Sequence, residues 1–134
     1  MHPGANHASI HNWDGLSPEQ ALASCELYGK SAPDVPHAMH MPGRIYSKVG
    51  MWNEAAIAMD SATRTELRYM NDRLALPFET WNYSHNRNYL CYIQEQLGMA
   101  KLSLQGSTDM LASPRDPDYN SEQAGQNSTE GLTA

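Results

Sequence analysis

Histidine is the residue type of this chain with the clearest chemical potential, because several of the six histidines recur at the spacing of a helical turn. His7 and His11 are four residues apart, and His37, His40 and Arg44 follow one another at intervals of three and four. On a helix, residues so spaced lie on one face, about a turn from each other. Imidazole binds transition metals in its neutral form, and it also donates and accepts hydrogen bonds. The spacing therefore predicts two helical faces that each carry a row of polar rings.

These faces support two interpretations. In the first, the imidazoles and their polar neighbours form an ordinary hydrogen-bonding surface for a peptide or a partner protein, and no cofactor is needed. In the second, an imidazole pair and a third imidazole from the next helix supply three ligands of a zinc or copper ion, with a fourth position open. The metal set that this second interpretation predicts is His7, His11 and His40, with His37 as the alternative third ligand.

Evidence for catalysis is weaker than evidence for binding. An open metal position could activate water, with Glu95 or Asp14 as the base. The chain has no His-Glu-x-x-His sequence, however, so a metalloprotease mechanism has no support. Neither Cys25 nor Cys91 belongs to a C-x-x-C motif, and glycine-rich phosphate-binding sequences are absent. Binding without chemistry is the function that the sequence favours.

The charge and composition of the 134 residues exclude several classes of partner. Nine Lys and Arg against fifteen Asp and Glu give a net charge of -6, and the basic residues are scattered singly along the chain. We therefore expect no nucleic-acid partner. No apolar run approaches the roughly 20 residues that a membrane span requires, and the basic-then-apolar pattern of a signal peptide is missing. We expect no membrane partner and a cytoplasmic location.

Apolar residues recur at helical spacing as far as Ala112, and no useful length of the chain alternates as a strand does. The predicted fold class is therefore all-α. Residues 113–134 combine proline, glycine and short polar side chains with very few aliphatic ones. Such a segment cannot bury enough apolar surface to offset its ordering entropy, so we predict a disordered tail there.

The boundaries between helices are marked by capping and turn residues. Ser17 opens the sequence Ser-Pro-Glu-Gln, which predicts a capping box and a helix start. Gly50 and Gly98 each predict a helix end directly before another helix, over Met51–Leu67 and Met99–Ala112. Such short turns make neighbouring helices antiparallel, so the chain is predicted to be a series of helical hairpins.

Pro42 conflicts with this pattern, because it lies inside a stretch that the hairpin frame makes helical. Proline lacks the backbone donor and its ring clashes with the preceding turn. We therefore predict either a kink or a late helix start near Met41, and either would alter the projection of His37 and His40.

The hairpins repeat at an interval of 34 residues, which superimposes Ala21 on Ala55 and Cys25 on Met59. The middle copy carries its small, aromatic and alanine residues at Gly43, Tyr46, Gly50, Trp52, Ala55, Met59 and Ala62. In this period and pattern, the segment 36–69 resembles the tetratricopeptide repeat family. A third copy fits the pattern if about 14 residues are inserted near 64–79. The prediction is one domain over 1–112, with about three helix pairs stacked as a short right-handed superhelix.

The resemblance also implies a function. Proteins of this family bind other molecules, mostly peptide segments, in a concave groove lined by the first helix of each hairpin. Eight residues occupy the corresponding positions here: His37, His40, Arg44, Lys48, His85, Asn88, Tyr92 and Glu95. The chain could be a piece of a longer array, and exposed repeat ends would then serve for self-association. The expected function is capture of a protein or peptide segment in this histidine-rich groove.

Overall fold

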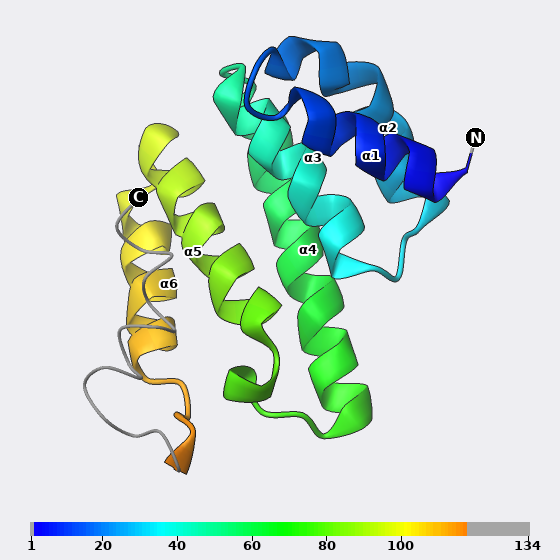
Figure 1. Ribbon diagram of the computed structural model, residues 1–134. Helices are drawn as coiled ribbons and strands as arrows, with labels where there is room; N and C mark the ends of the chain where they lie inside the picture. The colour runs from blue at the N-terminus through cyan, green and yellow to red at the C-terminus, as the bar shows by residue number, and fades with distance from the viewer. Residues whose placement is uncertain (1, 118–134) are drawn as a thin grey trace.

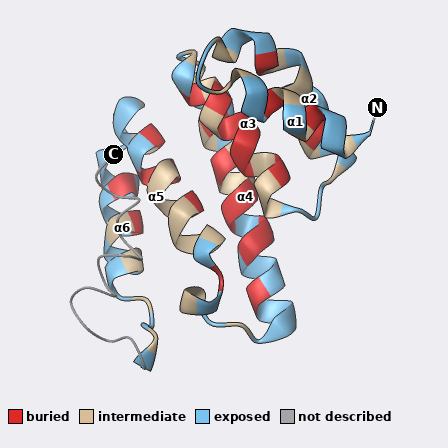
Figure 2. Cartoon of the chain, in the orientation of Figure 1, coloured by how far each residue is buried: buried red, intermediate tan, exposed pale blue. Residues whose placement is uncertain are grey.

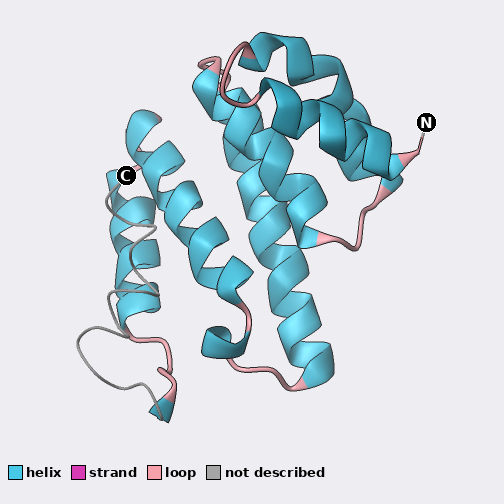
Figure 3. Cartoon of the chain, viewed as in Figure 1, coloured by secondary structure: helices cyan, strands magenta, loops and turns pink. Residues whose placement is uncertain are grey.

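The computed structural model describes residues 2–117, and all its regular structure is helical (Figures 1 and 3). This confirms the all-α prediction for the described residues. Residues 1 and 118–134 are not described, so the predicted disordered tail lies outside the described residues from residue 118 onward. The α-helices are α1 (Pro3–Trp13), α2 (Leu22–Ser31), α3 (Pro36–Lys48), α4 (Trp52–Arg73), α5 (Trp81–Gln96) and α6 (Ala100–Leu111). Two short 3-10 helices, Pro18–Ala21 and Pro77–Glu79, precede α2 and α5.

Two of the predicted helix ends depend on glycine and are confirmed. Gly50 and Gly98 adopt φ values of +78° and +72°, in the left-handed region that glycine enters without a steric penalty. The helices that follow them, α4 and α6, begin at Trp52 and Ala100. α4 is 22 residues long and continues to Arg73, so the residues of the predicted insertion extend this helix and form its exit loop.

The predicted capping box at Ser17 is wrong. The Ser17 side chain makes no capping hydrogen bond, and the backbone N–H of Gln20 donates instead to the Ser17 carbonyl at 2.9 Å. That bond closes a 3-10 turn over Pro18–Ala21, so the α-helix proper begins only at Leu22.

The late helix start predicted near Met41 is also wrong, because α3 begins at Pro36 and continues across Pro42. Packing accounts for this continuity. Pro42 and Gly43 are buried, and a Cβ added to Gly43 would lie only 3.0 Å from the Met59 side chain of α4. The close contact with α4 holds α3 in a helical conformation despite the lost backbone donor.

Two apolar clusters form the core, and α3 connects them. Figure 2 shows buried residues, in red, along both α3 and α4. The first joins α1, α2 and α3 through Ile10, Ala21, Cys25, Tyr28, Ala38, Met41 and Ile45. The second joins α4 and α5 through Ala55, Met59, Leu90 and Ile93. Tyr46 of α3 packs against both clusters. Each helix packs on the next along the chain, and α3 also contacts α1 and α5. Side chains on α3 can therefore meet residues from both ends of the sequence.

Within residues 2–117, none of the helices combines the length and the apolar character that crossing a bilayer requires.

Candidate metal centre

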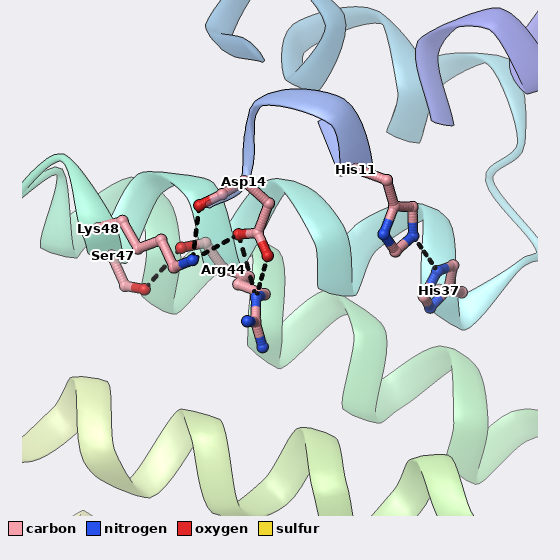
Figure 4. Close-up of polar contacts among 6 residues, drawn as sticks. All are labelled: His11, Asp14, His37, Arg44, Ser47 and Lys48. Carbon is pink, nitrogen blue, oxygen red and sulfur yellow. Dashed lines mark hydrogen bonds and ion pairs between the residues drawn. The ribbon is translucent and has the colours of Figure 1, made fainter. Parts of the chain in front are cut away.

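Three imidazoles from α1 and α3 converge on one point. His7 Nε2 lies 3.1 Å from His37 Nε2, and His11 Nε2 lies 3.5 Å from the same nitrogen. The three ligand nitrogens all lie within 4.8 Å of one another. Figure 4 shows His11 of α1 reaching across to His37 at the start of α3. His7 and His37 are half-buried and His11 is exposed, so the group lies at the surface and is accessible.

The core fixes the two helices that carry these rings. Ile10 on α1 and Ala38 on α3 are both completely buried in the first cluster, and each is a chain neighbour of one of the three histidines. Their burial sets the rotation of each helix about its axis. The His7 ring is further held by stacking on Tyr28 of α2, with ring centroids 5.5 Å apart. The three imidazoles are thus positioned by packing rather than by loop conformation.

The two nitrogen–nitrogen distances to His37 are close to those of a tetrahedral metal site. A zinc–nitrogen bond of about 2.0–2.1 Å places adjacent ligand nitrogens about 3.3–3.4 Å apart, close to the 3.1 and 3.5 Å found on either side of His37 Nε2. A single Nε2 carries either one proton or one lone pair, so the His37 nitrogen can hydrogen-bond fully to only one of its two neighbours. A cation that accepts all three lone pairs would resolve this conflict.

Electrostatics favour the form of imidazole that binds metals. Burial lowers the pKa of His7, and the neighbouring His11 lowers it further. Burial also lowers the pKa of His37, with added contributions from the charges of His7, His11 and His85. Metals bind neutral imidazole, so at neutral pH these two rings are already in the required protonation state.

His40, the third ligand in the predicted metal set, does not belong to this group; His37, the alternative, takes the place. The structure places both His7 and His11 opposite His37, one turn before His40 on α3. His40 stacks on His37 instead, with centroids 5.9 Å apart, and it approaches His85 of α5 to 4.7 Å. Its side chain is 4 % exposed, and burial, followed by the charges of His85 and His37, lowers the pKa of His40 to about 3.

Arg44 and Lys48, the two basic residues of the predicted groove, both bind Asp14 at the end of α1 (Figure 4). Arg44 Nε donates to both carboxylate oxygens of Asp14, at 3.1 and 2.9 Å. Lys48 Nζ lies 2.8 Å from one of these oxygens and donates to the Asp14 carbonyl at 2.7 Å. Burial alone would raise the pKa of Asp14, but the Lys48 hydrogen bond and the two positive charges together lower it. A carboxylate so paired is a weak base, which counts against the base role considered for Asp14.

Of the four predicted groove residues on α5, His85 lies beside the histidines of α3. Its ring contacts His40 and also Tyr89 and Trp81 of its own helix. Tyr92 contacts Trp52 of α4. Further along α5, Asn88 is half-buried, and Glu95 accepts a hydrogen bond at 3.0 Å from Ser103 of α6. The Glu95 carboxylate is therefore engaged on the α6 side of α5.

Two buried asparagines next to the histidines went unnoticed in the sequence. Asn6 and Asn86 are each 1 % exposed, and neither amide has a hydrogen-bond partner among the described residues. Each occupies a core position of its helix, Asn6 one turn before Ile10 and Asn86 one turn before Leu90. A polar residue within an apolar stripe was the available signal, since a buried amide without a partner is costly and rare.

Comparison with protein-family models, with curated proteins and with solved structures found no match for this chain. The tetratricopeptide resemblance therefore stays a prediction. The candidate metal centre is defined by the distances between its three imidazoles.

Proposed function

We propose that the chain binds a divalent transition-metal ion of the zinc type through His7, His11 and His37. The observation that carries the proposal is the convergence of three Nε2 atoms from two helices. In this proposal the helices pair and stack in tetratricopeptide fashion. Support comes from the packing of each helix on the next and from the α1–α3 and α3–α5 contacts. Such stacking gives residues 30 apart in sequence a common surface.

The ligand set favours zinc or copper over calcium or magnesium. Imidazole nitrogen suits zinc and copper, whereas the hard cations take oxygen ligands. Three protein ligands leave the fourth tetrahedral position free for an exogenous ligand, which is the arrangement of catalytic rather than structural zinc sites. A bound ion there would act as a Lewis acid toward whatever occupies that position. The protein's part is to hold three neutral rings in place on a packed scaffold.

A second candidate function, capture of a protein or peptide segment, is compatible with the first. A row of rings extends along α5 from Trp81 through His85 and Tyr89 to Tyr92. Trp81 is 68 % exposed and Tyr92 is 46 % exposed. Large exposed aromatic side chains are typical anchors of protein interfaces. This row supports the predicted binding surface on the face that α3 and α5 share.

The metal proposal is tested by the zinc content of the purified chain after equilibration with zinc and exhaustive dialysis. We expect about one zinc ion per chain for the natural sequence, because one group of three imidazoles converges. His7→Ala, His11→Ala and His37→Ala should each reduce the zinc content to a small fraction of that value, since two imidazoles bind far more weakly than three.

The matched control is His2→Asn. His2 lies outside the three-nitrogen group and caps α1 by accepting the Gly4 N–H, a role that asparagine can also fill. This variant should keep its zinc. Absence of stoichiometric zinc in the natural sequence, or equal zinc in all four variants, would refute the metal site.

A further inference from the structure

The guanidinium of Arg44 is held at one edge and free at the other. Its Nε donates to both oxygens of Asp14, which fixes the group's orientation. Its two terminal nitrogens make no hydrogen bond within the described part of the chain, and Figure 4 shows them pointing away from Asp14. A guanidinium presents those nitrogens as a fork that matches a carboxylate. Arg44 is thus a preoriented donor with its strongest recognition edge vacant.

The surroundings of Arg44 lack an acid to neutralise it fully. Asp14 carries one negative charge against the two positive charges of Arg44 and Lys48, which leaves a local excess of one positive charge in a chain of net charge -6. Arg44 also lies close enough to His40 and His85 for its positive charge to lower the pKa of both rings. An anionic ligand is therefore the partner that this position suits.

Unpaired polar groups lie beside the same strip of α3. His40 Nδ1 and the amide of Asn86 are buried and have no hydrogen-bond partner among the described residues. Buried polar groups without partners are costly. These groups make the region between α3 and α5 beside Arg44 polar rather than apolar.

The positions of Arg44 and the metal centre set the length of this ligand. His37 and Arg44 are seven residues apart on α3 and lie on the same face, so they are separated by about 10 Å along the helix axis. An extended peptide in the polyproline II conformation rises about 3.1 Å per residue with three residues per turn, so side chains three residues apart lie on the same side and about 9 Å apart. We propose that the chain binds an extended acidic peptide segment, with one carboxylate on the open metal position and a second, three residues away, on the fork of Arg44. This inference rests on the proposed metal site.

The test measures binding of the probe peptide acetyl-Asp-Gly-Gly-Asp-amide to the zinc-loaded chain by isothermal titration calorimetry. Arg44→Gln should weaken binding at least tenfold while leaving the zinc content unchanged. Asp14 keeps Lys48 as a partner in that variant, so the fold is not left with an unpaired carboxylate. Arg44→Lys serves as the second variant. A lysine ammonium can pair with Asp14 as Arg44 does, but it has no second pair of N–H donors for the peptide carboxylate. The same loss of peptide affinity is therefore expected.

Three controls separate specific recognition from general attraction. Lys101→Gln makes the same charge change at an exposed site on α6 and should alter the affinity less than twofold. The peptide acetyl-Asp-Gly-Gly-Asn-amide should bind weakly to the natural chain, with no further loss in Arg44→Gln. Removal of zinc should weaken binding of the probe peptide at least tenfold.

The possible failures are distinguishable, because zinc uptake is measured separately. A chain that takes up no zinc refutes the metal site and this inference together. Normal zinc uptake with no detectable peptide binding, or with equal affinities for Arg44→Gln and Lys101→Gln, refutes this inference alone.

Discussion

His37 is the residue at which two sets of rings meet. Its Nε2 faces His7 and His11, while the face of its ring stacks on His40. His40 in turn is buried against His85 of α5. Replacing His37 would therefore remove a ligand of the proposed metal site, whereas replacing His40 would mainly disturb the packing between α3 and α5. Residues of the same type, three positions apart, have different tasks because one lies at the surface and the other in the interior.

At the residue scale we predict how zinc retention depends on pH. Protons compete with the metal for neutral imidazole, and the pKa values of His7 and His37 lie below the ordinary histidine value of 6.5. Bound zinc should therefore be constant between pH 8 and pH 7. It should fall steeply once the pH drops below 6.5, where protons compete for the imidazole nitrogens. Zinc content after dialysis at a series of pH values measures this. Retention unchanged down to about pH 4.5 would indicate carboxylate rather than imidazole ligands.

The residues of the site were partly predictable from the sequence. The spacing of His7 and His11 on one helical face follows from the helical period alone, and the structure brings both rings together with His37. Whether His37 or His40 lies beside His7 and His11 depends on the position of α1 along the axis of α3. The spacing of residues within one helix does not determine that position. Asn86 was not found at all, because its place in the apolar stripe of α5, one turn before Leu90, was overlooked.

At the scale of the elements, close helix contacts depend on single glycines. Gly106 of α6 is buried against α5, and a Cβ added there would lie 2.6 Å from Cys91 Sγ. Gly106→Ala should therefore lower the free energy of unfolding by about 1–3 kcal/mol, despite the better helix propensity of alanine. Urea denaturation measures the change. Gly15→Ala is the control, because a Cβ at Gly15 would meet nothing within 4 Å; equal stability of the two variants would contradict this account of the α5–α6 contact.

Helix boundaries were predicted correctly where the conformational preference of a single residue determines them. Gly50 and Gly98 end their helices in the left-handed conformation that their lack of a Cβ makes accessible. The late helix start predicted from Pro42 was wrong, because the effect of proline on the local backbone is outweighed by the packing of α3 on α4, which is not local. The capping box predicted at Ser17 was also wrong, but the difference is small, since a 3-10 turn replaces the first turn of the α-helix.

At the scale of the whole molecule, α3 holds the arrangement together. It packs on α1 and α2 through one apolar cluster, and its Tyr46 also packs against the cluster of α4 and α5. A metal bound by His7, His11 and His37 would add a direct link between α1 and α3. The all-helical class was evident from the sequence, whereas the placement of α1 beside α3 depends on contacts between distant residues and is known only from the structure. The proposed site depends on that contact.

The most direct test of the central claim is X-ray absorption spectroscopy of the zinc-loaded chain at the zinc edge. The account predicts a first shell of four nitrogen or oxygen atoms at about 2.0–2.1 Å, with the outer-shell scattering of three imidazole rings. The zinc-loaded His37→Ala variant should lose one ring's contribution or fail to hold the metal. A spectrum with a sulfur shell near 2.3 Å, or one without imidazole scattering, would contradict the account.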